Sequence, residues 1–546
     1  MSDPSDEWSW HLPTSTSGYP PQRPVSNRSS ARTALPPVRP TAIGRQRPEA
    51  GRDAAPEAGP TGDFRRTVIF TIAGTVLPGL GLIAAKRRVI GGIILGIFGA
   101  IVVGTAIWAA VDLKSLLSVA VRPELLNPLS ICLIVVALIW VGVVLASHLS
   151  LRSSPTKAQR ITGGILVGVL SFAVAAPMAV AARYSYDQAS LVSKVFKSEK
   201  NTKSATRPTI TVPTKPGQTQ SQDPWAGKPR LNILLLGGDA GPGREGTRTD
   251  TVILASIDTK TGNTTLFSLP RNTGRMPFPS DSPLHRYYPY GFTNGNGDDP
   301  EYFLNAMYDN VPRRVPKDVL GPTDNLGADT LKISVGEALG LKVDYYVLIN
   351  LQGFEKLINA LGGITVNINT YIPIGGNTDL HIPPKAYLHP GPKQHLNGKN
   401  ALWYARGRYG SDDFARMDRQ RCVINAMIKQ ANPANVLARY EDITKAGKDI
   451  VLTDIPREVL PIMVDLSLRV KNGNVRSIVF KHGVAGFSSP DPDFALMRHR
   501  VKVALSETKT APTKSAKPGG GSTESEDVND TCAYNPKVAA TAQPPR

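Results

Sequence analysis

Four long apolar stretches lie between residues 65 and 183 and limit what this chain can fold into. Each is close to the length of about twenty residues that a helix needs to cross a bilayer. None has the form of a cleaved signal peptide, because the first begins only at Thr67. We therefore expect a helical membrane region with apolar stretches at 67–85, 89–111, 129–148 and 161–182.

The basic loops predict the orientation of this membrane region. Residues 86–88 and 152–160 are rich in Lys and Arg, which favours the cytoplasmic side and places everything after residue 183 outside. Arg65 and Arg66 also favour a cytoplasmic tail, but a spanning segment cannot have both ends inside. We therefore expect 67–85 to be a re-entrant or interfacial hairpin, followed by three spans. The competing arrangement has four spans and an external N-terminus.

Three further segments are poor in apolar periodicity. Residues 1–64 are rich in Pro, Ser, Gly and Arg and predict a disordered cytoplasmic tail. Residues 184–228 are predicted to be an extracellular linker, which would let the following domain move along the membrane face. Residues 509–546 are predicted to be a low-complexity C-terminal tail.

Residues 229–508 carry the pattern of a globular domain, in which short apolar strands alternate with helical segments. This alternation predicts an α/β fold with a mixed central sheet flanked by helices. The predicted strands include 345–350 and 364–368, and the predicted helices are 353–361, 414–430, 455–470 and 492–505.

Residues 402–420 concentrate arginines and carboxylates. Arginine binds phosphate through two parallel donors, so Arg406, Arg408, Arg416 and Arg419 together suit a diphosphate. On a helix, Asp413, Arg416, Arg419 and Gln420 would share one face. The alternative for such a segment is a solvated, salt-bridged surface helix.

Two aspartates favour the anion site over that alternative. Asp239 follows an apolar strand, and Asp250 lies at the entrance to the next one. Two carboxylates at neighbouring strand ends can share a hard cation. Magnesium (or manganese) fits, because magnesium is held by one or two carboxylates and completes its shell with phosphate oxygens and water. A third strand ends in Arg271.

Six motifs occur in an order that resembles the LytR-CpsA-Psr family, over roughly residues 229–510. Several ordered motifs are far more specific than any single one. They are Gly237-Gly238-Asp239, Arg248-Thr249-Asp250-Thr251, Leu269-Pro270-Arg271-Asn272, Ala360-Leu361-Gly362-Gly363-Ile364, His395 to Leu402 and Arg406 to Gln420. Many family members have aspartate where this chain has Asn272.

The resemblance implies a membrane-anchored phosphotransferase of the bacterial cell envelope. Such an enzyme moves an anionic glycopolymer from a polyprenyl diphosphate carrier to peptidoglycan, forms a phosphodiester and releases polyprenyl phosphate. The resemblance also implies that Asp239 and Asp250 hold the metal and that Asp413 orients arginines. The residues implied to grip the diphosphate are Arg248, Arg271, Arg406, Arg408, Arg416, Arg419 and Gln420.

Other functions stay open at this point. A diphosphatase would use water as the acceptor, and a scaffold would present the glycopolymer without chemistry. A lipid tail would be shielded between the sheet and its helices by residues such as those in 347–361, although the same residues also suit an ordinary core. The general base is unresolved among Asp239, Asp250 and Asp413, and the sequence does not indicate an oligomeric state.

The net charge of +19 raises the question of nucleic acid. The chain carries no helix-turn-helix or finger motif, so we expect no nucleic-acid partner. The positive charge suits anionic membrane lipid, glycopolymer and diphosphate.

Cysteine usage adds one structural expectation. Cys132 lies within an apolar stretch, whereas Cys422 and Cys532 are both extracellular in the predicted topology. An external pair favours a disulfide. On the predicted helix, Cys422 faces away from Asp413, so a Cys422–Cys532 bond would leave the polar face undisturbed.

Overall fold

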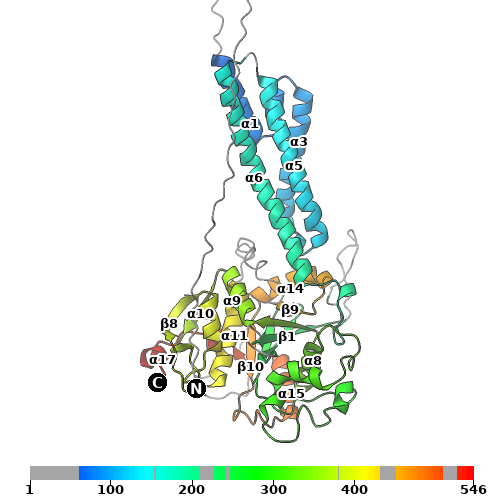
Figure 1. The fold of residues 1–546 in the computed structure, drawn as a ribbon, viewed down its shortest axis with the longest axis vertical. Coiled ribbons are helices and arrows are strands. Elements are labelled where there is room, and N and C mark those ends of the chain that lie inside the picture. Colours follow the sequence, from blue (N-terminus) through cyan, green and yellow to red (C-terminus); the bar gives the residue numbers. More distant parts are fainter. Residues whose placement is uncertain are drawn as a thin grey trace, which may run out of the picture. The chain divides into compact units, whose positions relative to one another are not determined.

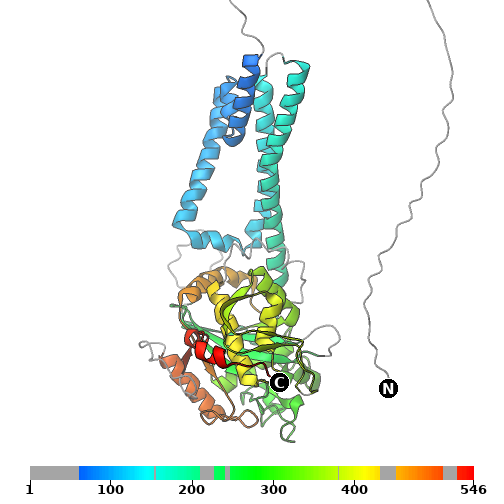
Figure 2. The same cartoon turned by 90° about the vertical axis from the view of Figure 1, so that its left-hand side faces the viewer.

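The membrane region contains three helices that are long and apolar enough to cross a bilayer. A computed structural model describes residues 61–152, 155–208, 225, 227–239, 246–378, 380–430, 451–507 and 525–545. The predicted N-terminal tail lies almost wholly outside these ranges. The three long apolar helices are α3 (Arg88–Val111), α5 (Pro123–Leu151) and α6 (Lys157–Val195). Figure 2 shows α5 and α6 running side by side.

The segment predicted to form a hairpin is broken into two short helices, α1 (Thr61–Val76) and α2 (Leu80–Ala84). The break contains Pro78, which has no N–H to donate, and Gly79, whose φ of 100° favours glycine. Both helices lie against α5, because the Trp140 indole donates to the Thr75 carbonyl at 3.1 Å and Gly81 packs on Ser147. Whether this segment re-enters the membrane stays a prediction. A short helix, α4 (Leu113–Val119), precedes α5.

Helix α6 continues past residue 183, where the linker was predicted to begin, and that boundary must be corrected. Arg183 and Asp187 pair one turn apart, and Val192 is buried against Trp225 and Leu231 of the following domain. The polar composition of this stretch is typical of a linker, but tertiary packing stabilises it as helix. Residues 209–224 and 226 of the predicted linker lie outside the described part of the chain.

The α/β domain is built on a seven-stranded mixed sheet, which confirms the predicted fold class. Its strand order is β11-β10-β3-β2-β1-β4-β9. Strand β1 is parallel to β4 and antiparallel to β2, and β3 is parallel to β10. The strands are β1 (Arg230–Gly238), β2 (Thr249–Asp258), β3 (Thr264–Leu269), β4 (Tyr345–Asn350), β9 (Val451–Thr453), β10 (Val475–Val479) and β11 (Glu526–Asp527).

Helices cover both faces of this sheet (Figure 1). Alternate residues of β1 enter different cores, because strand side chains point to opposite faces. Leu234 and Leu236 pack in one core with α8 (Leu326–Leu339) and α15 (Phe494–Glu507). On the other face, Leu231 packs near α14 (Leu460–Asn472). Helix α8 was not predicted from the sequence, because it is buried almost all round and shows no polar face.

The remaining elements lie outside the main sheet. The predicted strand 364–368 forms, but it pairs with β8 in a separate two-stranded sheet rather than with the main sheet. The elements are β5 (Ile364–Ile368), β6 (Ile372–Ile374), β7 (Ala386–Leu388), β8 (Gly391–Leu396), α7 (Met307–Arg314), α9 (Leu351–Ala360), α10 (Gly398–Arg406) and α11 (Asp413–Gln430). In the described part of the chain the 3-10 helices are η1 (Glu199–Asn201), η2 (Pro283–Arg286), η3 (Pro300–Tyr302), η4 (Leu304–Ala306) and η5 (Arg457–Val459).

The predicted disulfide is confirmed, since Cys422 on α11 is bonded to Cys532 with a Cα–Cα distance of 5.6 Å. The predicted low-complexity tail therefore needs correction for residues 525–545, which form β11, α16 (Val528–Thr531) and α17 (Pro536–Thr541). Val528 is fully buried. The disulfide, the edge strand, the buried valine and hydrogen bonds from Asn367 and Asn369 to the carbonyls of Cys532 and Ala533 hold this segment. Composition alone does not reveal such contacts with distant residues.

Candidate active site

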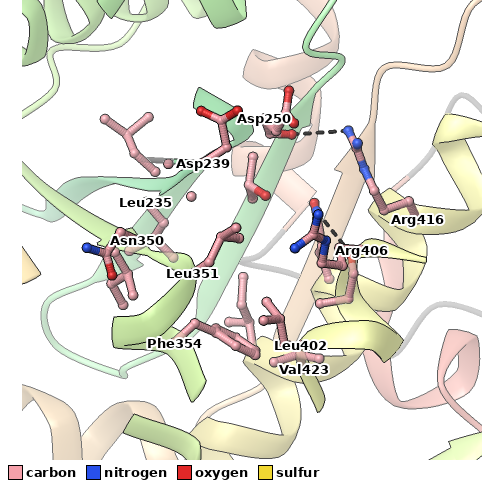
Figure 3. A pocket seen from close by; sticks show the side chains of 18 of the residues that line it. Leu235, Asp239, Asp250, Asn350, Leu351, Phe354, Leu402, Arg406, Arg416 and Val423 are labelled. Atoms are coloured by element: carbon pink, nitrogen blue, oxygen red, sulfur yellow. Dashed lines mark hydrogen bonds between the residues drawn. The ribbon is translucent and has the colours of Figure 1, made fainter. Parts of the chain in front are cut away.

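A cavity of about 350 Å³ opens where β1 and β4 end and β2 begins, beside α9, α10 and α11. Figure 3 shows Asp239, Asp250, Arg406 and Arg416 at one end and Phe354, Leu402 and Val423 at the other. The cavity is thus polar and charged at one end and apolar at the other. Its polar lining consists of Asp239, Asp250, Thr251, Asn350, Arg406, Arg408, Arg416 and Gln420.

Strand pairing brings the two aspartates to this cavity. Strand β1 runs antiparallel to β2, and the register shifts between Gly237 and Gly238 at the end of β1. Asp239 follows directly, and its Oδ1 accepts the backbone N–H of Arg248 at 2.8 Å. Asp250 follows Arg248 by two residues and lies near the start of β2. The predicted acidic pair at neighbouring strand ends is therefore present as a geometric feature.

The surroundings of Asp250 keep it ionised. Its Oδ1 accepts hydrogen bonds from Arg271 Nη1 at 3.1 Å and from Asn305 Nδ2 at 3.3 Å. Burial alone raises the pKa of Asp250, but the positive charges of Arg271 and Arg416 outweigh burial and hold the pKa below its usual value. Asp250 therefore stays a carboxylate below the pH at which an ordinary aspartate takes up a proton.

Asp413 lies at the centre of the arginine cluster. Its carboxylate oxygens lie 3.0 Å from Arg416 Nη2, 3.4 Å from Arg271 Nε and 3.9 Å from Arg408 Nη1. Arg416 also donates to the backbone carbonyl of Asp250 at 3.1 Å, which joins α11 to β2 (Figure 3). The Arg416 side chain is only 4% exposed, although Arg416 lines the cavity. One carboxylate thus holds three arginines from three different segments.

Three of the predicted phosphate-gripping arginines lie outside the cavity lining, namely Arg248, Arg271 and Arg419. Arg271 instead contacts Asp250 and Asp413, as described above. Arg248 pairs with Glu301 and donates to the Pro300 carbonyl at 3.4 Å. Arg419 donates from Nε to the Tyr404 carbonyl at 2.7 Å and from Nη2 to the Gly407 carbonyl. Arg248 and Arg419 thus have partners within the protein that the sequence did not indicate, and their contact with a diphosphate stays a prediction.

Arg419 holds the C-terminal end of α10 and the loop that begins at Gly407. A cation at a helix C-terminus satisfies carbonyls that lack partners within the helix. Because Arg406 and Arg408 flank this point, Arg419 positions both of them relative to α11. In this structure Arg419 therefore holds the segment that carries Arg406 and Arg408.

Replacing Arg419 by alanine should lower the free energy of unfolding by about 1–3 kcal/mol, since two buried carbonyls lose their donor. The activity that the family resemblance implies should fall less than in Arg416→Ala. Chemical denaturation and rates measured on the same preparation test this expectation. A loss of rate equal to that of Arg416→Ala with unchanged stability would contradict it and would place Arg419 on the substrate.

Several residues that shape the site were not predicted from the sequence. Asn305, on η4, donates to Asp250 from 55 positions along the chain. The Trp403 ring lies 5.0 Å from the Arg406 guanidinium carbon. Asn350 lines the cavity and caps α9 by accepting the Gly353 N–H at 2.7 Å. Its position between a strand and a helix was a readable capping signal, whereas Asn305 offered none.

The fold and the site define a class, namely an α/β domain on membrane helices whose cavity suits a phosphate or diphosphate beside an apolar group. The chain belongs to the LytR-CpsA-Psr family, whose model matches residues 186–483. The predicted family membership is thereby confirmed.

Curated relatives share up to half of this chain. The polyisoprenyl-teichoic acid–peptidoglycan teichoic acid transferase TagU of Oceanobacillus iheyensis is 30% identical over 265 residues, which cover 47% of this chain and 68% of the relative. TagU of Enterococcus faecalis is 30% identical over 233 residues, which cover 42% and 62%. TagV of Bacillus subtilis is 28% identical over 232 residues, which cover 42% of this chain and 50% of the relative.

Solved structures also resemble this domain. Protein gbs0355 of Streptococcus agalactiae is 26% identical, and the match covers 53% of this chain and 92% of that chain with a TM-score of 0.37. The structure of Bacillus subtilis TagV is 24% identical, and the match covers 52% of this chain and 99% of that chain with a TM-score of 0.34.

Proposed function

We propose that this protein is a membrane-anchored phosphotransferase of cell-wall assembly. It moves an anionic glycopolymer from a polyprenyl diphosphate carrier to peptidoglycan, as the names of the TagU relatives describe for teichoic acid. The observation that carries the proposal is the cavity, in which an arginine and aspartate end adjoins an apolar end. A lipid-linked diphosphate has the same two parts.

The reaction exchanges one phosphorus–oxygen bond for another. A hydroxyl oxygen of peptidoglycan attacks the phosphorus that carries the glycopolymer, and the bond to the bridging oxygen of the diphosphate breaks. Polyprenyl phosphate leaves, and the hydroxyl proton passes to a base, for which Asp239, Asp250 and Asp413 remain candidates. Phosphoryl transfer depends mostly on positioning and charge neutralisation, so a set of arginines suits it without a protein nucleophile.

The arginines of the cavity would bind the diphosphate. Arg416 is held in place by Asp413 and by the Asp250 carbonyl, so its remaining donors need little reorganisation to meet a phosphate. Arg406 and Arg408 line the same end of the cavity, together with Gln420. Fixed donors of this kind stabilise charge that develops during transfer.

Asp239 and Asp250 would hold a magnesium or manganese ion. Both line the charged end of the cavity, and the low pKa of Asp250 keeps its carboxylate ready for a cation. Within the described ranges no group of three or more metal-binding side chains occurs. The pair of carboxylates fits magnesium, which takes one or two carboxylates and leaves its other positions to phosphate oxygens and water. When bound, the ion would neutralise charge on the diphosphate.

The apolar end of the cavity would hold the first part of the polyprenyl chain. It lies between the sheet and α9 and α11, and Val347 and Phe354 belong to the segment that was predicted to shield a lipid tail. A volume of about 350 Å³ suits the phosphate-proximal part of such a chain. The apolar lining is formed by Leu235, Leu236, Val347, Ile349, Leu351, Phe354, Leu402, Ala405, Val423, Ile424, Met427 and Ile428.

This function places the domain on the extracellular face of the membrane, where peptidoglycan is found. The basic loops 86–88 and 152–160 support that orientation, and helices α3, α5 and α6 support a multi-pass anchor.

The full-length protein should transfer saccharide from a synthetic polyprenyl diphosphate donor to peptidoglycan in the presence of magnesium. We expect polyprenyl phosphate and phosphodiester product in equal amounts, and loss of both with EDTA. Asp250→Asn should reproduce that loss, because it removes a carboxylate charge and keeps the side chain's size. Asp281→Asn, at an exposed position away from the cavity, serves as the matched control.

Each departure from this result has a distinct meaning. Release of polyprenyl phosphate without acceptor would indicate a diphosphatase. Tight binding without release would indicate a scaffold. Full activity in EDTA would contradict the metal site while leaving the transferase function intact.

A further inference from the structure

Residues 197–207, directly after α6, lie along the surface of the α/β domain, and we call them the strap. The Arg457 N–H donates to the Lys197 carbonyl at 3.0 Å. Glu458 accepts the Ser198 hydroxyl at 2.6 Å and the Glu199 N–H at 3.0 Å. Farther along, the Asp324 N–H donates to the Lys203 carbonyl at 2.9 Å, and the Lys203 N–H donates to the Asp324 carboxylate at 3.2 Å. The strap is thus attached at both ends.

The middle of the strap completes a buried charged cluster. Lys332 on α8 has a fully buried side chain and lies 2.5 Å from Asp454 and 4.0 Å from Asp329. Asp329, which is 1% exposed, accepts three bonds from the strap. Its donors are the Ser204 hydroxyl at 2.9 Å, the Thr206 hydroxyl at 2.5 Å and the Ala205 N–H at 3.0 Å.

Burying charges is costly unless each has partners. Without the strap, Asp329 would lose these three donors, and Asp454 would lose the 3.2 Å bond from the Ser204 hydroxyl. The domain therefore favours a state in which the strap is bound. A tether that needed only to be long and loose would not require this cluster.

The same cluster connects the strap to the cavity. Asp454 Oδ1 accepts the backbone N–H of Tyr346 in β4 at 2.8 Å. Strand β4 continues to Ile349 and Asn350, which line the cavity. At the membrane end, Val192 of α6 and Phe196 pack in the core that contains Leu231 of β1. A continuous set of contacts thus runs from the last membrane helix to the strands that form the cavity.

We propose that the strap fixes the α/β domain on the end of α6, so that the cavity is held in a set position for a substrate whose apolar chain lies in the bilayer. This inference rests on the proposed function, and it makes Asp329, Lys332 and Asp454 positioning residues. For residues 184–207 it replaces the predicted mobile linker by a fixed attachment, because the bound strap removes the freedom that a flexible segment of that length would have.

The test distinguishes an effect on the position of the cavity at the membrane from an effect on the chemical step. The full-length protein in lipid vesicles receives a six-residue Gly-Ser insertion between Phe196 and Lys197, which separates α6 from the strap but leaves the strap's contacts with the domain. Two donors carry the same diphosphate saccharide. One has a long polyprenyl chain in the same vesicles, and the other has a short, water-soluble chain.

The insertion should lower the rate with the vesicle-bound donor by about tenfold, because the effective concentration of the cavity at the membrane falls. The rate with the soluble donor should stay unchanged. The same insertion between Pro216 and Gly217 is the matched control, since it follows the strap, and it should affect neither rate.

A second variant, Ser204→Ala with Thr206→Val, removes strap donors without lengthening the chain. It should lower the rate with the vesicle-bound donor relative to the rate with the soluble donor. A thermal melt shows whether the domain remains folded. Equal rates of wild type and insertion variant on the vesicle-bound donor would overturn the inference. Failure of wild type on both donors would overturn the proposed function instead.

Discussion

Replacement of Arg416 by alanine should lower the rate of transfer by about 10²- to 10³-fold, the loss typical when one preorganised donor is removed from a site of charge stabilisation. Arg416 is buried at the charged end of the cavity and contacts both Asp413 and the Asp250 carbonyl. Its loss removes a hydrogen-bond donor to the phosphate and also releases α11 from β2. Steady-state rates with a lipid-linked diphosphate donor measure the effect.

Two variants show whether the loss belongs to the site. Arg416→Lys keeps the positive charge but not the planar pair of donors, so it should recover little activity. Arg313→Ala removes an exposed arginine that pairs with Asp309 one turn away on α7, and it should leave the rate unchanged. If Arg416→Ala kept more than about a tenth of the wild-type rate, the cavity would not be the site of transfer.

Removal of the Cys422–Cys532 bond should lower the free energy of unfolding by about 2–5 kcal/mol. The bond joins residues 110 positions apart, and closing a long loop restricts the unfolded chain strongly. The double variant Cys422→Ser and Cys532→Ser should therefore unfold at lower denaturant concentration. A reducing agent should bring the wild type to a similarly low stability.

The third cysteine provides the control. Cys132 is a free thiol on α5, so Cys132→Ser should leave the denaturation midpoint and its response to reductant unchanged. Loss of the disulfide should also lower transfer activity, because residues 525–545 approach the site. The Tyr387 hydroxyl donates to the Pro545 carbonyl at 2.8 Å, and Pro545 packs on Gly410 in the loop after Arg408. Unchanged stability of the double variant would show that the other tail contacts suffice.

Much of the site was predictable, because its residues fall in short ordered motifs. Asp239 and Asp250 line one cavity with Arg406, Arg408, Arg416 and Gln420. The helical face that carries Asp413 and Arg416 formed as its periodicity indicated. Hydrophobic periodicity also placed the strand 345–350 correctly. Each of these inferences depends on spacing within a few turns of chain.

Other features escaped prediction because their cause lies far away in the chain. Arg419 resembles its neighbours in sequence, yet its guanidinium binds the carbonyls that end α10. Nothing in the local pattern distinguishes it from Arg416. Helix α8 has no amphipathic pattern, because the domain surrounds it. The strap has the composition of a linker, and its order comes from Asp329 and Asp454.

Local patterns therefore suffice for the family, the α/β class, the apolar helices and the acidic and basic residues of the cavity. Periodicity and motif order are properties of neighbouring residues, and they survive in any context that preserves the fold. The folded arrangement alone shows which arginines face the cavity, which one holds a helix end, and that the segment after α6 is bound. Those outcomes depend on which distant groups compensate a buried charge or an unpaired carbonyl, and no local pattern contains that information.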